Sequence, residues 1–339
     1  MVGKSTTLNG IALVGSGSAT PSQEISNVQL GHRVETSDEW IRTRTGIGKR
    51  RISTPEENLS HLAYRSAKQA LNMAGWQPAD LDLILLATST PDDLFGSAPQ
   101  VQAQLGATNA VAFDLTAACS GFLFALVSAA QFLRTGAMKR ALVIGADQLS
   151  RWVDWDDRGT CVLFGDGAGA VAVESTDLDQ DGLLGFKLKS DGRRGDSLTL
   201  RQIEENLPLV DGSLHQRGGF ASIQMNGQEV FKFAAREVPL ILQGLLSDTS
   251  TEAANLDWLL LHQANQRILD AVAERFSIPF EKVLSNLANY GNTSAATIPL
   301  MLDEAVRASR VQPGHLIASS GFGAGLSWGA ALLRWQGPS

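Results

Sequence analysis

The sequence contains very little cysteine. Two cysteines, Cys119 and Cys161, stand in 339 residues, and they form no C-x-x-C pair. This excludes a disulfide framework and a zinc site built on cysteines, and it is typical of a protein from a reducing compartment. The histidines show no H-x-x-H or H-E-x-x-H spacing, so we expect no metal site. They stand singly, at His32, His61, His215, His262 and His315.

An excess of positive charge is also absent. The chain has 28 Lys and Arg against 35 Asp and Glu, a net charge of −7, which argues against nucleic acid as the main partner. No apolar stretch follows Lys4, so no signal peptide is expected. The uncharged run 115–133 is long enough to cross a membrane but contains several polar residues, which favours a core helix. We therefore expect a cytoplasmic protein with no membrane partner.

A nucleotide loop is missing as well. The glycine-containing turn after the apolar segment 11–15 is not followed by a βαβ unit with an acidic residue about 20 positions on, so no dinucleotide cofactor is expected. The length of the chain allows two domains or one large one, with a sizeable core.

The chain does contain a long uncharged segment around Cys119. We predict a buried strand over 111–115, a turn of small residues, and a helix over 119–135 that ends at Gly136. Unpaired N–H groups and the helix dipole favour an anion at the first turn of a helix. The pKa of a thiol, about 8.5 when free, can fall to roughly 3.5–7.5 there. Cys119 is therefore a candidate nucleophile; the alternative is a small hydrophobic residue of the core.

A basic cluster surrounds Trp40 in an otherwise acidic protein. Arginines or lysines stand at Arg42, Arg44, Lys49, Arg50 and Arg51. This pattern favours a ligand that carries phosphates and a ring able to stack. A solvated helix end with a half-buried tryptophan is the alternative.

Two parts of the sequence repeat one another. LDLILLATST at 81 matches LDWLLLHQAN at 256, an offset of 175, and the same offset carries Cys119 onto Ser294. The repeat predicts a duplicated α/β unit, with halves over 1–178 and 179–339. Related halves place equivalent helix ends near a shared pseudo-two-fold axis, so Cys119 should face the turn at 292–294.

Two further polar residues stand next to apolar segments, one after a strand and one before a helix. His262 stands where a predicted strand leaves the core, and Asn292 precedes the second largely apolar helix. A structural histidine and a helix N-cap are the alternatives for these two residues. Their place opposite the Cys119 helix makes them candidates for one site.

The motifs, taken in order, resemble the β-ketoacyl-[acyl-carrier-protein] synthase III family over 11–335. They are GSGSATP, SDEWIRTRTGI, DLTAACSGF, DRGT, FGDGAGA, MNGQEVFKFA, HQANQRI, YGNTSAA and GFGAGLSWGAALLR. The resemblance implies a thiolase-like α/β fold with two duplicated halves in a five-layered α-β-α-β-α sandwich. It implies the initiating condensation of type II fatty acid synthesis, in which acyl-CoA, with acetyl-CoA expected, and malonyl-acyl carrier protein give 3-oxoacyl-acyl carrier protein, CoA and CO2.

The same resemblance implies roles for named residues. Cys119, His262 and Asn292 would be catalytic, and the backbone N–H groups of Cys119 and Ala324 would form an oxyanion hole. The CoA substrate would contact Thr36, Trp40, Arg44, Arg158 and Asn265. The carrier protein would dock on Lys232, Arg236, Arg267 and Arg275, for which solvated surface charge is the alternative. At the acyl pocket, Phe95 would reach across a homodimer, and Phe322 would support the catalytic groups. No cofactor is implied, because the CoA thioester is a substrate.

Several other enzyme classes share part of this pattern. Elongating ketosynthases have His at the position of Asn292, and biosynthetic thiolases need a second catalytic cysteine, for which Cys161 is not placed. A polyketide-type condensing enzyme shares Cys, His and Asn but uses malonyl-CoA. Papain-like hydrolases share the chain order, but no C-G-[SA]-C-[WY] motif surrounds Cys119. A silent acyl-binding partner would be expected to lack the cysteine.

Overall fold

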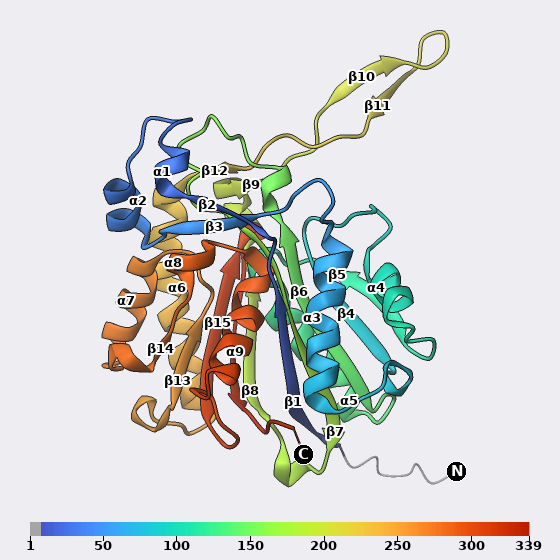
Figure 1. The fold of residues 1–339 in the computed structure, drawn as a ribbon, viewed down its shortest axis with the longest axis vertical. Helices are drawn as coiled ribbons and strands as arrows, with labels where there is room; N and C mark the ends of the chain where they lie inside the picture. Colours follow the sequence, from blue (N-terminus) through green and yellow to red (C-terminus); the bar gives the residue numbers. More distant parts are fainter. Residues whose placement is uncertain (1–7, 339) are drawn as a thin grey trace.

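Two five-stranded sheets with equivalent strand order form the centre of the molecule (Figure 1). The computed structural model describes residues 8–338. The first sheet has the order β1 (Gly10–Ala19), β7 (Asp166–Thr176), β6 (Arg140–Gln148), β4 (Leu83–Ala87), β5 (Val111–Leu115). The second has the order β8 (Leu183–Ser190), β16 (Ser327–Arg334), β15 (Leu316–Gly323), β13 (Trp258–Leu261), β14 (Val283–Leu284). In each sheet three parallel strands continue into two antiparallel ones, which confirms the predicted duplication.

Helices lie between the sheets and on both outer faces (Figure 1). The inner layer consists of α5 (Gly121–Arg134) and α9 (Thr297–Arg307). The outer face of the first sheet carries α3 (Leu59–Ala74) and α4 (Ala98–Leu105). The outer face of the second sheet carries α6 (Gly227–Asp248) and α7 (Gln266–Arg275). The inner helices pack in one core cluster with residues of both sheets, because their apolar side chains point in both directions. The fold is therefore the expected five-layered sandwich.

The segment 190–219 contains a two-stranded hairpin that projects from the body (Figure 1). The remaining elements are α1 (Asn27–Leu30), α2 (Asp38–Thr45), α8 (Leu287–Tyr290), β2 (Gln23–Ser26), β3 (Lys49–Ile52), β9 (Leu198–Thr199), β10 (Glu205–Pro208), β11 (Leu214–Arg217) and β12 (Gln224–Met225). The expected boundary between 178 and 179 falls in a short turn between β7 and β8. The outer ends of the two expected halves, residues 1–7 and 339, lie outside the described residues. The division into these halves stays a prediction.

The segment around Cys119 differs from the prediction in two ways. Its strand, β5, is the edge of the first sheet and is not buried, since 55% of Val111 and 39% of Phe113 is exposed. Cys119 itself lies in a short 3-10 turn, η2 (Ala118–Ser120), and the α-helix begins only at Gly121. The apolar run was correctly read as a core helix, but hydropathy does not tell an edge strand from a central one.

The second half carries the equivalent turn, η8 (Ser294–Ala296), before α9. Each turn opens on a residue with left-handed backbone, Ala118 at φ 47° and Ser294 at φ 53°. These residues are 176 positions apart, so the counterpart of Ser294 is Ala118 rather than Cys119, and the offset of 175 was wrong by one residue here. The error did not affect the main expectation, because the two turns do face one another: the Ser294 hydroxyl contacts the Cys119 sulfur.

The two halves are in close contact where β6 meets the η8 turn. A Cβ atom added to Gly145 of β6 would lie 2.1 Å from the carbonyl oxygen of Ala295. Backbone cannot move out of the way as a flexible side chain can, so only glycine fits at this point of β6.

We predict that Gly145→Ala lowers the free energy of unfolding by about 1–3 kcal/mol, the usual cost of overpacking a close contact. Urea denaturation measures this change. Gly192→Ala is the matched control, because no atom lies within 4 Å of the added Cβ there. Equal stability of the two variants would contradict the tight contact between the halves.

Candidate active site

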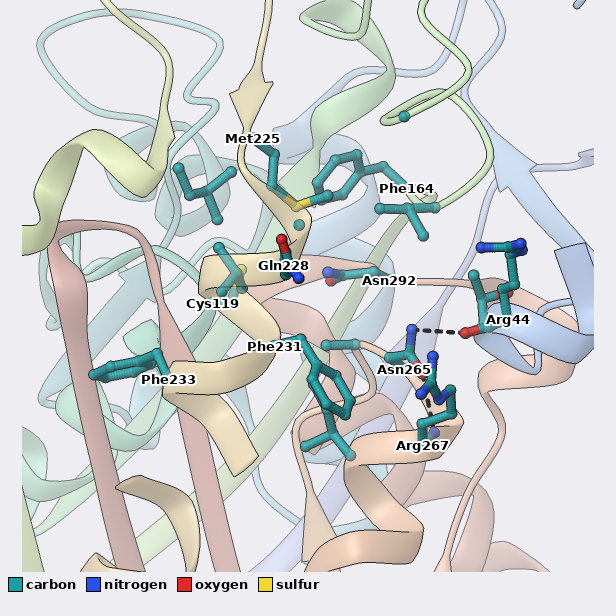
Figure 2. A pocket seen from close by; sticks show the side chains of 18 of the residues that line it. Arg44, Cys119, Phe164, Met225, Gln228, Phe231, Phe233, Asn265, Arg267 and Asn292 are labelled. Carbon is teal, nitrogen blue, oxygen red and sulfur yellow. Dashed lines mark hydrogen bonds between the residues drawn. The ribbon is translucent and has the colours of Figure 1, made fainter. Parts of the chain in front are cut away.

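A cavity of about 690 Å³ opens between the two halves and contains the predicted catalytic residues. Cys119, His262 and Asn292 all line it, although they come from three distant parts of the chain. Figure 2 shows the side chains of Cys119 and Asn292 directed toward a common space beneath Met225 and Gln228. The fold therefore brings together the three residues that the sequence singled out.

Cys119 lies at the inner end of this cavity and is 6% exposed. Burial raises the pKa of its thiol to about 12, and the Asp147 carboxyl adds to this effect. The hydroxyl of Ser294, which donates to Sγ at 3.3 Å, acts in the opposite direction. The positive end of the α5 dipole also favours the thiolate, but burial outweighs it. Cys119 is therefore a thiol in the free protein, and not the expected thiolate. The sequence could not show this, because desolvation depends on the folded surroundings.

His262 follows β13 and is almost fully buried, with 2% of its surface exposed. Burial lowers the pKa of its imidazole to about 3, so the ring is neutral. Its Nδ1 lies 2.7 Å from the Thr297 hydroxyl. The ring of Phe322 stands edge-on to it, with 5.2 Å between centroids. His262 is therefore an oriented, uncharged group beside the cavity.

Asn292 is held on both sides by backbone hydrogen bonds. Its N–H donates to the Leu163 carbonyl at 2.9 Å, and its own carbonyl accepts from Gly165 N–H at 3.0 Å. Its Oδ1 accepts from the N–H of Ser294 at 2.9 Å, which leaves the amide Nδ2 as the free end of the side chain. Asn292 does not cap α9, since the N-cap position of that helix is Ala296.

The Ala324 turn lies against Cys119. A second, narrow cavity of about 80 Å³ is lined by both residues and by Ser294. The preceding Gly323 approaches so closely that an added Cβ would lie 2.6 Å from the Cys119 nitrogen. The remaining lining is largely apolar and comprises Leu149, Phe164, Leu198, Leu200 and Ile223, with Ser89, Ala118 and Thr199.

The two phenylalanines expected at the acyl pocket lie apart. Phe322 lines the main cavity beside His262. Phe95 is 97% exposed and lines a surface depression next to β5, and it is not in the lining of either cavity at Cys119. Within one chain, therefore, Phe95 does not contribute to the pocket.

The predicted CoA-contact residues gather at the mouth of the cavity. The guanidinium groups of Arg44 and Arg158 lie 4.7 Å and 4.9 Å from the centre of the Trp40 ring. Asn265, the N-cap of α7, donates to the Arg44 carbonyl at 3.1 Å (Figure 2). Thr36 is not in the lining, but its buried hydroxyl has no hydrogen-bond partner among the described residues.

The basic cluster around Trp40 is divided by the fold. Only Arg44 lines the cavity. Arg42 pairs with Asp38, and Lys49 and Arg51 pair with Glu24. Arg50 is fully buried and donates to Asn27 and to the Val162 carbonyl. The interpretation of the whole cluster as a phosphate site was wrong, because four of its members serve the local structure.

The four predicted docking residues also separate. Lys232 and Arg267 line the mouth of the cavity, and the Arg267 guanidinium lies 5.1 Å from the centre of the Phe231 ring (Figure 2). Arg236 is exposed on α6 near Glu237, and Arg275 is exposed in the last turn of α7; neither lines the cavity.

Sequence reasoning missed several residues of the site. Ser294 and Thr297 touch the candidate catalytic groups, and Met225, Gln228 and Phe231 form part of the wall. The hydroxyl-rich turn after Asn292, which the repeat placed opposite Cys119, could have indicated the first two. The others belong to the motif MNGQEVFKFA, in which only Lys232 was given a role. Among residues 8–338 no cluster of His, Cys, Asp or Glu could hold a metal ion, and no helix there is long and apolar enough to cross a membrane.

Comparison with known proteins gives a consistent result. The family described as 3-oxoacyl-[acyl-carrier-protein] synthase III matches residues 113–192, and its C-terminal counterpart matches residues 246–335. A β-ketoacyl-[acyl-carrier-protein] synthase III of Prochlorococcus marinus is 73% identical over 338 residues, which is 100% of both chains. The synthase III of Synechococcus elongatus is 62% identical and covers 96% of this chain and 97% of its own.

Solved structures agree with this similarity. The 3-oxoacyl-[acyl-carrier-protein] synthase III of Aquifex aeolicus superposes with a TM-score of 0.88 at 43% identity, over 96% of this chain and 100% of its own. A priming β-ketosynthase from a polyketide biosynthetic pathway superposes with a TM-score of 0.89 at 32% identity, over 100% of both chains.

We predict that His262 stays neutral from pH 8 down to pH 5. Its folded pKa lies below the unfolded value of about 6.5, so the folded protein binds fewer protons between these values. The contribution of the neutral His262 to the free energy of unfolding is therefore fully present above pH 6.5 and falls as the pH drops toward 3. NMR titration of the imidazole signals, assigned with His262→Gln, measures the charge. A midpoint between pH 6 and 7 would contradict the buried neutral ring.

Proposed function

The chain belongs to the 3-oxoacyl-[acyl-carrier-protein] synthase III family, whose reaction joins an acyl-CoA primer to malonyl-acyl carrier protein, and we propose that Cys119, His262 and Asn292 carry it out. The observation that supports these roles most is the convergence of the three side chains on one cavity from both halves of the fold. The reaction divides into two half-reactions at the Cys119 sulfur.

In the first half-reaction, the Cys119 sulfur attacks the thioester carbon of acyl-CoA. A carbon–sulfur bond forms to Cys119, the bond to CoA breaks, and the thiol proton leaves with CoA as its free thiol. The backbone N–H groups of Cys119 and Ala324 stabilise the oxyanion of the tetrahedral intermediate. One such donor typically lowers the free-energy barrier by about 2.7–4 kcal/mol.

In the second half-reaction, His262 Nε2–H and the Asn292 amide donate to the thioester carbonyl of malonyl-acyl carrier protein. The bond to the carboxylate breaks, CO2 leaves, and the electron pair forms an enolate that both donors stabilise. The enolate carbon then attacks the acyl group and releases Cys119. A neutral His262 suits this role, since it donates without having to act as a base.

The mouth of the cavity supports a binding site for CoA. The guanidinium groups of Arg44 and Arg158 both lie close to the Trp40 ring, so the adenine of CoA would be sandwiched between Trp40 and Arg44, with Arg158 nearby. The unpartnered Thr36 hydroxyl and Asn265 would supply polar contacts. No cofactor is needed, because the thioester carries the energy of the reaction.

The narrow cavity beside Cys119 supports a short primer such as acetyl. About 80 Å³ with an apolar lining suits a small acyl group better than a long one. The donor is malonyl-acyl carrier protein rather than malonyl-CoA, the substrate of a polyketide-type enzyme, because two exposed basic side chains, Lys232 and Arg267, line the entrance of an otherwise acidic protein. Arg236 and Arg275, exposed on α6 and α7 outside that lining, would add to the docking surface.

A homodimer would cover the exposed edge of the first sheet. The apolar side chains of Val111 and Phe113 on β5 and of Phe95 nearby are exposed in the single chain. An uncovered edge strand pairs readily with another strand, and a second copy would satisfy it. Phe95 would then reach the acyl pocket of the partner.

We also propose the two halves 1–178 and 179–339 as the structural units of the chain, and a cytoplasmic location for the protein.

The proposed roles predict separate losses in the two half-reactions. Cys119→Ala abolishes acyl-enzyme formation and condensation. His262→Ala and Asn292→Asp spare acylation by acyl-CoA but slow malonyl decarboxylation by about 10²–10³, the usual effect of losing one donor. Release of CoA and of labelled CO2 measures the two steps. Decarboxylation at the wild-type rate in His262→Ala would disprove its role.

The docking surface predicts a selective loss. The pair Lys232→Glu and Arg267→Glu raises the KM for malonyl-acyl carrier protein about tenfold, because the charge that attracts an acidic partner is reversed. The KM for acyl-CoA changes less. The matched control is Arg65→Glu with Lys68→Glu on α3, which reverses the same charge on an outer face. Equal effects on both substrates, or from both pairs, would disprove the surface.

A further inference from the structure

The η8 turn and the first residue of α9 together contact all three proposed catalytic residues. The Ser294 hydroxyl donates to Cys119 Sγ at 3.3 Å, and the Ser294 N–H donates to Asn292 Oδ1 at 2.9 Å. Thr297, one turn further on, lies 2.7 Å from His262 Nδ1. Both hydroxyl residues are almost fully buried, so solvent cannot replace these contacts.

The hydrogen bonds of Thr297 decide which nitrogen of His262 carries the proton. The Thr297 hydroxyl has one proton and two neighbouring acceptors, the Ser294 carbonyl at 3.0 Å and His262 Nδ1 at 2.7 Å. The Ser294 carbonyl also accepts from the Thr297 N–H, so it keeps a donor whichever way the hydroxyl turns. We assign the hydroxyl proton to the shorter contact, the one with Nδ1, which leaves the proton of the neutral ring on Nε2. This is the tautomer that can donate to a substrate carbonyl.

Ser294 acts on the sulfur. A hydroxyl that donates to sulfur favours the thiolate over the thiol. The charged group that faces Cys119 is Asp147 at the end of β6, which acts in the opposite direction, while His262 is neutral. The hydrogen bonds that the Asp147 carboxyl accepts come from Thr88, Ser89, Thr90 and the Ala295 N–H, so the single proton of the Ser294 hydroxyl is left for Sγ.

The backbone of Ser294 does not by itself require serine. Its φ is 53°, in the left-handed region that glycine or asparagine adopts at lower cost, and Ala118 has φ 47° at the equivalent turn. The hydroxyl that contacts sulfur is what distinguishes Ser294 from this counterpart.

We propose that Thr297 and Ser294 are positioning residues that each serve one half-reaction. Thr297 holds His262 as the Nε2–H tautomer for decarboxylation, and Ser294 stabilises the Cys119 thiolate for acylation. The inference rests on the proposed roles of Cys119 and His262.

Thr297→Val tests the first assignment, because valine keeps the shape of threonine and removes its hydroxyl. We expect malonyl decarboxylation to fall about tenfold or more, the effect of weakening one donor, while acylation by acetyl-CoA changes less than about twofold. Two-dimensional 15N NMR of the imidazole should show the Nε2–H pattern in the wild type and a mixture of tautomers in the variant. An unchanged tautomer, or an Nδ1–H ring in the wild type, would overturn the assignment.

Ser294→Ala tests the second assignment. We expect the pH profile of Cys119 alkylation by iodoacetamide to shift to higher pH, and acylation to fall about tenfold, a change of about 1.4 kcal/mol in the barrier. Decarboxylation should be spared, because the backbone N–H that holds Asn292 remains. Ser294→Gly relieves the left-handed backbone and should give the same shift if the hydroxyl is the cause.

The controls separate this inference from the proposed function. Ser128→Ala removes a hydroxyl of α5 that bonds only to the Phe124 carbonyl, and should change neither step. If both variants slowed both half-reactions equally, the division of roles would be wrong. The alkylation profile and the tautomer involve no substrate, so their shifts would stand even if His262→Ala showed that the proposed mechanism fails.

Discussion

The buried carboxylate of Asp147 joins the two halves of the molecule at the point where the site is built. It accepts from the Thr88 and Thr90 hydroxyls and the Ser89 N–H of its own half, and from the Ala295 N–H of the other half at 3.1 Å. A carboxylate at a helix N-terminus is favourable, and this one holds the η8 turn against β6. The contacts of Ser294 with Cys119 and Asn292 depend on that placement, as does the close approach of Ala295 to Gly145. The placement of the two halves against one another therefore also sets the placement of the proposed catalytic groups.

Burial gives this site its chemical character. It raises the pKa of the Cys119 thiol and lowers that of His262, so both groups are neutral before substrate arrives. Hydrogen-bond donors are stronger in such surroundings than in water. A decarboxylating condensation needs donors for an enolate rather than a strong base, and a dry cavity also protects the enolate from protonation by water. The neutral histidine and the amide of Asn292 are suited to that chemistry.

Local patterns in the sequence predicted much of this arrangement. The uncharged run before Arg134, the repeat that pairs Leu81 with Leu256 and the polar residues after two strands led to the fold and to the three side chains in the cavity. Environment, which depends on distant segments, was harder to predict. The expectation of a thiolate at Cys119 did not include desolvation by the second half. The interpretation of the basic cluster did not include the hydrogen-bond partners of Arg50. Ser294 and Thr297 were missed because their role depends on where their hydroxyls point, which composition does not determine.

In the proposed mechanism one sulfur, on the first half, carries the acyl group while donors from the second half act on the other substrate. Mass spectrometry of the protein after exposure to acetyl-CoA, before and after addition of malonyl-acyl carrier protein, distinguishes this mechanism from one without an acyl-enzyme. We expect one acetyl group on the peptide that contains Cys119, and its complete transfer to 3-oxoacyl-acyl carrier protein in the chase. Condensation without an adduct on that peptide, or an adduct that the chase leaves in place, would contradict it.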